Sequence, residues 1–186
     1  HAGGQRGKTI EATVAGSNLD AATALRITGK GIVPKILSVS AASCRVSFQI
    51  AADAELGERE LRIVTPGGIS NRFRFFAGYL PEINETEPNS DKGQPQRLAA
   101  LPIVINGQIT ETDRDYFQFS AKAGDCLVFD IQARQIVPYI ADAVPGWFDA
   151  CLTLYASDGE QLCSADDYRF RPDPVLTYTI AKDGEY

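Results

Sequence analysis

Short runs in which apolar and polar residues alternate, separated by turn residues, limit the fold of this chain more than any other feature. In Cys44–Ile50 and Glu60–Val64, apolar side chains recur at every second position with polar or charged ones between them. Successive residues of a strand face opposite sides of a sheet, so this pattern predicts strands with one buried face. Turn signals such as Pro66-Gly67-Gly68 and Ser157-Asp158-Gly159 recur about every 8 to 12 residues. The sequence therefore predicts an all-β fold of the sandwich type.

The alternating runs form two blocks. The first lies within residues 9–76 and the second within residues 103–180. Residues 81–97 between them contain Pro81, Pro88 and Pro95 and show no alternation, which is typical of a linker or an extended edge. We therefore predict two β-sandwich domains in tandem, residues 1–80 and 98–186, joined by an acidic linker, residues 81–97.

Charge and composition exclude several classes of partner. The formal net charge of −6 disfavours nucleic acid and anionic membrane surfaces, which select basic faces, and makes a cation the more natural small partner. No apolar run approaches the roughly 18 residues of a spanning helix, so we expect no membrane span. The 186 residues include no methionine, and we expect the chain to be a processed or excised piece of a longer protein.

The sequence offers little for catalysis. Its single histidine is His1, at the terminus, so a Ser/His/Asp or Cys/His arrangement lacks a base. A carboxylate-based hydrolase stays open as an alternative, because acidic pairs such as Asp113 with Asp115 and Asp166 with Asp167 are present. These pairs lie in turn-like contexts, and we expect a protein that is not an enzyme.

The four cysteines are too widely spaced for the paired Cys-x-x-Cys arrangement of a zinc site. They are Cys44, Cys126, Cys151 and Cys163. One disulfide within the second half and a set of buried or half-buried free thiols both stay open.

The first half resembles an immunoglobulin-like domain of the IPT/TIG type. The resemblance rests on Gly16-Ser17-Asn18-Leu19, on Ala51–Gly57, on the run Leu61–Ser70, and on Phe73-Arg74-Phe75. It covers about residues 3 to 78 and implies a binding or spacer module without catalytic residues.

The second half is similar to the bacterial pre-peptidase C-terminal domain. The similarity rests on Glu85–Asn89, Asn106–Ile109, Asp113–Phe119, Ala123–Asp125 and Asp183–Tyr186. It implies a jelly-roll-like, non-catalytic β-sandwich found in secreted or surface proteins beside peptidases. Two departures stand out. The family continues with a strand beyond the motif that here ends at Tyr186, so we expect a truncated sandwich, and residues 135–148 are longer than the usual connection.

The linker also carries a dense set of oxygen donors. Glu82, Glu85, Glu87 and Asp91 surround Asn89, with no basic side chain before Lys92. Ca²⁺ takes about 6 to 8 oxygen ligands from such groups. Asp113 and Asp115, two residues apart in a strand-like segment, would face the same side. The family resemblance implies Glu85, Glu87, Asn89, Asp113 and Asp115 as ligands, with Asp91 as a further candidate because Ser90 stands where an aspartate is common.

Two interpretations of these acidic residues stay open, a calcium site and a solvated linker followed by turn-capping aspartates. A second candidate site consists of aromatic side chains that could stack on a polymer: Tyr139, Trp147, Phe148 and Tyr168. A satellite core around the Pro-rich loop is the plainer interpretation of these aromatics.

Together these observations predict a non-catalytic binding, adhesion or spacer module of a larger bacterial protein. We expect this protein to be secreted, periplasmic or on the cell surface, with Ca²⁺ as its cofactor. Its partners would be an extracellular polymer or protein and the other domains of the parent protein. A purely structural module without a ligand is the remaining alternative.

Overall fold

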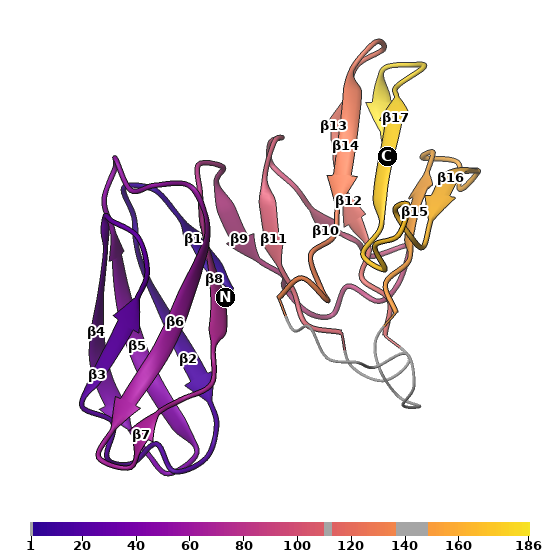
Figure 1. The fold of residues 1–186 in the computed structure, drawn as a ribbon. Coiled ribbons are helices and arrows are strands. Elements are labelled where there is room, and N and C mark those ends of the chain that lie inside the picture. Colours follow the sequence, from indigo (N-terminus) through magenta and orange to yellow (C-terminus); the bar gives the residue numbers. More distant parts are fainter. Residues whose placement is uncertain (1, 110–112, 137–148) are drawn as a thin grey trace. The chain divides into compact units, whose positions relative to one another are not determined.

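The computed structural model describes residues 2–109, 113–136 and 149–186. These residues form strands and turns without a helix, which confirms the predicted all-β class (Figure 1). The chain divides into two compact units, residues 1–83 and 84–186, each with a hydrophobic core of its own. None of the described segments is a helix long and apolar enough to cross a membrane.

The first unit is a sandwich of two sheets. One sheet has the order β1 (Gly3–Gln5), β8 (Phe73–Gly78), β6 (Gly57–Thr65), β3 (Ala24–Ile27), with the short β7 (Gly68–Ile69) also paired to β6. The other has the order β2 (Thr9–Ala15), β5 (Ser43–Ile50), β4 (Ile32–Val39). All pairs are antiparallel except β1 with β8, which is parallel.

Alternate residues of the central strands fill the space between these sheets. Val46, Phe48 and Ile50 of β5 are buried, and they pack in one cluster with Ile63 of β6 and Phe75 of β8. The rings of Phe48 and Phe75 lie with their centroids 4.7 Å apart. Burial of one such side chain stabilises the fold by about 1.5 to 3 kcal/mol. The period-two pattern of the sequence is therefore the pattern of this core.

The second unit consists of short strand pairs. The antiparallel pairs include β14 (Cys126–Asp130) with β17 (Val175–Thr179), β15 (Leu152–Tyr155) with β16 (Gln161–Ala165), and β13 (Ser120–Ala121) with β18 (Gly184–Glu185). The strand β10 (Gln96–Arg97) pairs in parallel with β12 (Phe117–Gln118), and β9 (Glu82–Asn84), the strand at which the second unit begins, pairs with β11 (Val104–Asn106).

Phe119 is the centre of the second core. It packs in one cluster with Leu154, Leu176 and Ile180, all buried, and its ring lies 5.7 Å from that of Phe129 between centroids. The second block of alternating runs, predicted within residues 103–180, contains β11, β12, β14, β15 and β17.

The four thiols are free. Cys44 is buried and Cys163 half-buried, and burial raises the pKa of both thiols above the ordinary value. Cys126 and Cys151 are exposed. Two of the four thiols therefore fit the expectation of buried or half-buried groups, and the other two do not.

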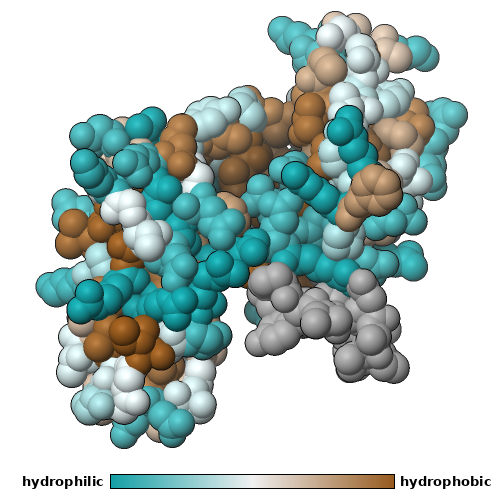
Figure 2. Space-filling view, in the orientation of Figure 1, coloured by the Kyte–Doolittle hydropathy of each residue, from teal (hydrophilic) through white to brown (hydrophobic). Residues whose placement is uncertain are grey.

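Hydrophilic residues cover much of the face of each unit seen in Figure 2, and hydrophobic residues form separate patches there. Single exposed apolar residues such as Val33 of β4 and Val128 of β14 are ordinary on soluble β proteins and need no partner.

Candidate metal site in the second unit

The site begins with residues 84–97, which we name the acidic strap. The strap starts at the last residue of β9 and ends with β10, and it contains no other strand. The side chain of Gln96 holds the start of the strap, because its Oε1 accepts from Thr86 N at 2.7 Å and its Nε2 donates to Asn84 O at 3.2 Å. At the middle of the strap, Tyr116 N donates to Asn89 O at 2.9 Å. The strap therefore lies against the segment that leads into β12.

Lys92 fixes the far part of the strap. Its Nζ lies 3.5 Å from the centroid of the Tyr155 ring and donates to Gly159 O at 3.1 Å. A cation over an aromatic face is attracted by the ring's quadrupole. The strap is thus tied to the β15–β16 hairpin by one side chain.

Three carboxylates converge where the strap meets this segment. One oxygen each of Glu85, Glu87 and Asp115 lies within 4.8 Å of the other two. Glu85 and Asp115 are half-buried and Glu87 is exposed. Carboxylates at this separation repel one another strongly unless a proton or a cation lies between them. The arrangement is therefore suited to a metal ion.

The crowding of carboxylates changes the pKa of Asp115. Burial, followed by the negative charges of Glu85 and Asp113, raises its pKa from 3.8 to about 6. A hydrogen bond between the Asp115 and Glu85 carboxyl groups, together with the charge of Glu87, contributes further. Two carboxyl groups can hydrogen bond only when one of them is protonated, so this contact is favourable below the pKa of Asp115, and above that pKa the two charges repel each other.

Polar atoms that lack a donor or acceptor surround the same place. Glu85 Oε2, Asp115 Oδ1 and both amide atoms of Asn89 are buried, and apart from the contact between the two carboxyl groups no described residue hydrogen bonds to them. Asn89 is 0% exposed. Its backbone N donates to Glu87 Oε2 at 2.9 Å, which keeps it beside the carboxylates. A buried amide without a partner is costly, and an amide oxygen is a good ligand for a hard cation.

The remaining candidates lie differently. Asp113 Oδ1 accepts from Ser90 Oγ at 2.8 Å and from Arg114 N at 2.9 Å, so one of its oxygens already has two donors. Asp91 Oδ1 accepts from Gly93 N at 2.8 Å, which caps a turn of the strap. The structure therefore groups Glu85, Glu87 and Asp115, keeps Asn89 beside them, and turns Asp91 to its own backbone.

Two features of the site escaped sequence reasoning. Gln108 N donates to Glu85 Oε1 at 2.6 Å, and a Cβ on Gly107 would lie only 2.5 Å from Glu85 Oε2. Residues 107 and 108 thus position the Glu85 carboxylate. Asn106 and Gly107 belong to one of the motifs on which the family resemblance rests. The glycine at position 107 was the only feature of the sequence that could have indicated a close approach of another group.

Asp173 is a further residue whose role the sequence did not reveal. It is 3% exposed and accepts from the backbone N of Ala133, Arg134 and Gln135 at 3.1, 2.8 and 2.9 Å. Its carboxylate holds in place a second segment, which at Arg134 is 39 residues away in the chain. Of the aromatic candidates, Tyr168 is 37% exposed, and Tyr139, Trp147 and Phe148 lie outside the described residues.

No family model matches the chain. It is 31% identical over 115 residues to a probable subtilase-type serine protease of Deinococcus radiodurans, covering 58% of this chain and 14% of that protein. The chain thus spans a small part of that relative.

Among solved structures, the chain is similar to a Bacteroides ovatus protein, SGBP-B of a mixed-linkage glucan utilization locus, described in complex with a mixed-linkage heptasaccharide. The match has a TM-score of 0.29 and 13% identity, and it covers 96% of this chain and 33% of the other. A likeness at that TM-score supports no inference about fold or function.

Proposed function

We propose that the chain is a non-catalytic accessory part of a larger secreted or surface protein, and that Ca²⁺ stabilises its second unit. The observation that carries the proposal is the convergence of Glu85, Glu87 and Asp115 around buried oxygens that lack donors. In this proposal the first unit is an Ig-like spacer and the second a pre-peptidase-type sandwich, each contributing to binding of an extracellular polymer or protein.

The donor set supports calcium more than other metals. Three carboxylates and the Asn89 amide are hard oxygen ligands, and the described residues near them include neither cysteine nor histidine. Bidentate carboxylates and water would complete the roughly 6 to 8 oxygens that Ca²⁺ takes at about 2.3 to 2.6 Å. Mg²⁺ demands a stricter octahedron and retains its water, so a flexible acidic strap favours the larger ion. Asp113 would act through Ser90 and the backbone, as a residue that orients Asp115.

The relative supports the wider context. A subtilase-type protease that is 31% identical to this chain over 115 residues suggests that the parent protein is an extracellular protease. In that setting the chain would lie outside the catalytic domain and would stabilise, extend or present it.

Isothermal titration of Ca²⁺ into chelator-treated protein tests the proposal. We expect binding with a Kd of about 10⁻⁴ M or tighter, and a higher melting temperature in calcium. The triple variant Glu85→Gln/Glu87→Gln/Asp115→Asn keeps the size of each side chain and should lose both effects. Asp91→Asn, which removes an acidic group outside the cluster, should keep them. Absence of both heat and thermal shift in the parent at several millimolar Ca²⁺ would refute the proposal.

The raised pKa of Asp115 also favours a second candidate, a carboxylate-based hydrolase, because a protonated carboxyl beside an ionised one is what general acid catalysis uses. The same variants separate the two functions. A hydrolase would lose turnover of a glycan or peptide substrate in Asp115→Asn while its melting temperature stayed independent of calcium.

A further inference from the structure

An unusual turn lies in the second unit between β16 and β17. Tyr168 N donates to Arg171 O at 2.9 Å and Arg171 N to Tyr168 O at 3.0 Å, so Arg169 and Phe170 form a two-residue hairpin loop. We name residues 168–171 the arginine turn. Arg169 has a φ of 59°, in the left-handed region that such a loop normally fills with glycine or asparagine. The backbone requirement of a tight turn therefore does not explain why arginine is present at position 169.

The arginine turn holds a large apolar side chain fully in solvent. Phe170 is 104% exposed, and the next most exposed large hydrophobic among the described residues, Tyr79, is 67% exposed. Arg169 lies over the neighbouring Tyr168 ring, with 5.3 Å between its Cζ and the ring centroid. An exposed aromatic on a strained turn contributes nothing to the core, and aromatic and arginine side chains are the ones that anchor protein interfaces.

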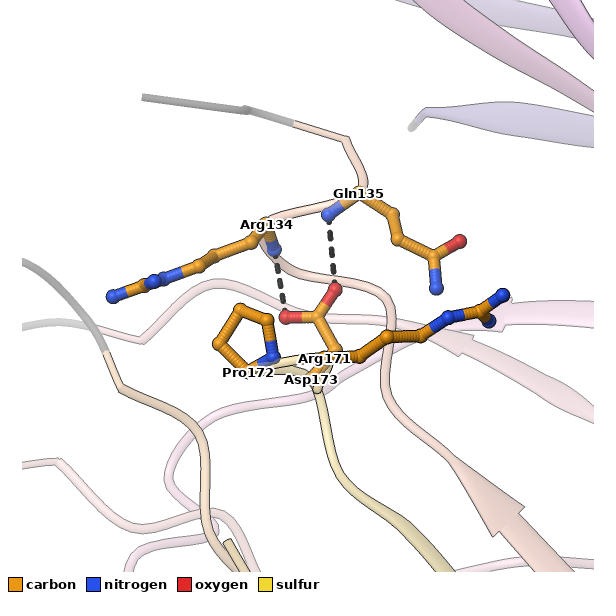
Figure 3. Close-up of a pocket in the computed structure, with 5 residues that line it drawn as sticks. All are labelled: Arg134, Gln135, Arg171, Pro172 and Asp173. Atoms are coloured by element: carbon orange, nitrogen blue, oxygen red, sulfur yellow. Dashed lines mark hydrogen bonds between the residues drawn. The ribbon is translucent and has the colours of Figure 1, made fainter. Parts of the chain in front are cut away.

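A hollow of about 350 Å³ adjoins the arginine turn. It is lined by Arg134, Gln135, Arg171, Pro172 and Asp173 (Figure 3). In Figure 3 the side chains of Gln135 and Arg171 extend to the same side of Asp173, and Arg134 extends to the other. The planar guanidinium of Arg171 is a donor suited to a carboxylate.

Asp173 is the one acid among the described residues that line the hollow, and its carboxylate already has partners within the protein. The Asp173 oxygens accept the three backbone N–H groups of residues 133–135, two of which are drawn in Figure 3. Asp173 therefore fixes the backbone on which Arg134 and Gln135 stand. Pro172, whose ring fixes φ, stiffens the chain between Arg171 and Asp173. The donors of the hollow are thus carried on a preorganised backbone, which lowers the entropic cost of binding.

We propose that the arginine turn and the hollow beside it form a docking site for an acidic segment of a polypeptide partner. A carboxylate of that segment pairs with Arg171, and an apolar side chain two residues along packs on Phe170. Arg169, stacked on Tyr168, faces a second carboxylate. The site is separate from the acidic cluster, so the proposal does not depend on metal binding.

Charge and shape favour a polypeptide over other polyanions. The exposed residues Asp166 and Asp167 precede the turn, and the whole chain carries a net charge of −6, so a long polyanion such as nucleic acid or an anionic bilayer would be repelled around the turn. A short acidic segment can contact the arginines of the turn without extending over these two aspartates. A polypeptide also supplies an apolar side chain for Phe170, which a polyanionic backbone lacks.

Fluorescence anisotropy with a short labelled peptide of alternating glutamate and leucine tests the docking site at about 0.15 M salt. We expect micromolar binding to the intact protein. Phe170→Ala and Arg171→Gln should each weaken it by at least about tenfold. Phe170→Ala removes a fully exposed side chain, so the fold is retained, and melting curves verify this. Arg26→Gln, which removes an exposed arginine of the first unit, is the matched control and should bind as the parent does.

Comparator probes decide between the occupants. A peptide with lysine for glutamate and one with serine for leucine should both bind at least about tenfold more weakly. The proposal is overturned by any of three results: no binding of the acidic peptide, equal binding by Phe170→Ala and the parent, or tighter binding to heparin or to phosphatidylserine vesicles than to the peptide.

Discussion

Substitution of Gly107 by alanine is the sharpest test of the metal site, because the structure predicts opposite effects with and without calcium. A Cβ added at position 107 would lie 2.5 Å from Glu85 Oε2, and Cβ contacts essentially never fall below 3.0 Å, so the carboxylate must move by at least about 0.5 Å. The obstacle is the far end of a flexible side chain, so Glu85 can move while the backbone stays in place. The fold is therefore expected to survive.

The size of this displacement sets the expected loss of affinity. Ca²⁺–oxygen distances span only about 0.3 Å, from about 2.3 to 2.6 Å, so a shift of about 0.5 Å takes one ligand out of range. Displacing a ligand from its proper orientation weakens metal binding by about 10- to 100-fold. We expect Gly107→Ala to lower calcium affinity by that factor, which corresponds to about 1.4 to 2.7 kcal/mol.

Without calcium the same substitution should not destabilise the protein. Moving Glu85 away from Asp115 relieves repulsion between their carboxylates, and alanine also restricts the unfolded chain relative to glycine by about 0.4 to 1 kcal/mol. The assay is a pair of melting curves, in chelator and in saturating Ca²⁺, together with calorimetric titration. Gly93→Ala is the matched control, because its Cβ would lie 3.4 Å from Asp91 Oδ1, an ordinary contact outside the cluster. If Gly107→Ala binds calcium within twofold of the parent, the assignment of Glu85 as a ligand is wrong.

Other contacts of the second unit lead to three more expected outcomes. In chelator, the Asp115 carboxyl should make the protein less stable as the pH rises through about 6. Its pKa is raised from 3.8 to about 6 in the fold, so the folded state binds the extra proton between these values. A pH series of melting temperatures should show this decline relative to Asp115→Asn, and a parallel decline in the variant would contradict it. Lys92→Gln should cost about 0.5 to 1.5 kcal/mol in urea unfolding by removing the contacts with Tyr155 and Gly159, whereas Lys122→Gln, at an exposed site, should cost nothing measurable. Asp173→Ala should lower the free energy of unfolding by about 1.5 to 3 kcal/mol, because three backbone N–H groups lose a charged acceptor, and an unchanged urea midpoint would refute that role.

Much of the fold could be read from alternation, and its failures have physical causes. The runs Cys44–Ile50 and Glu60–Val64 are central strands with one face in the core, so their pattern is regular. The strand β1 is only three residues long and contains two glycines, which carry no side chain to show a pattern. The short strands at the two ends of the strap, β9 and β10, could not be predicted for a different reason. Each pairs with one other strand, and the Gln96 side chain adds a hydrogen bond. Neither kind of contact produces an alternating pattern in the sequence.

For the candidate metal site, the sequence showed which ligand types were present but not which of them meet. Asp91 and Asp113 carry the same carboxylate group as Asp115, and spacing alone could not rank them. In the structure Asp91 caps its own turn, and Ser90 donates to Asp113. Short local hydrogen bonds of this kind compete with ligand geometry and depend on a few degrees of backbone rotation.

The residue pattern alone predicts the all-β class and a concentration of oxygen donors around residues 85–91, because side-chain period and residue chemistry are local properties. The packed fold was needed to show that Glu85, Glu87 and Asp115 converge, that Gly107 leaves room for one of them, and that Phe170 stands in solvent beside Arg171. The first two outcomes join residues far apart in the chain. They arise from how the strap and the strands close on the core around Phe119, and no local pattern records such distances.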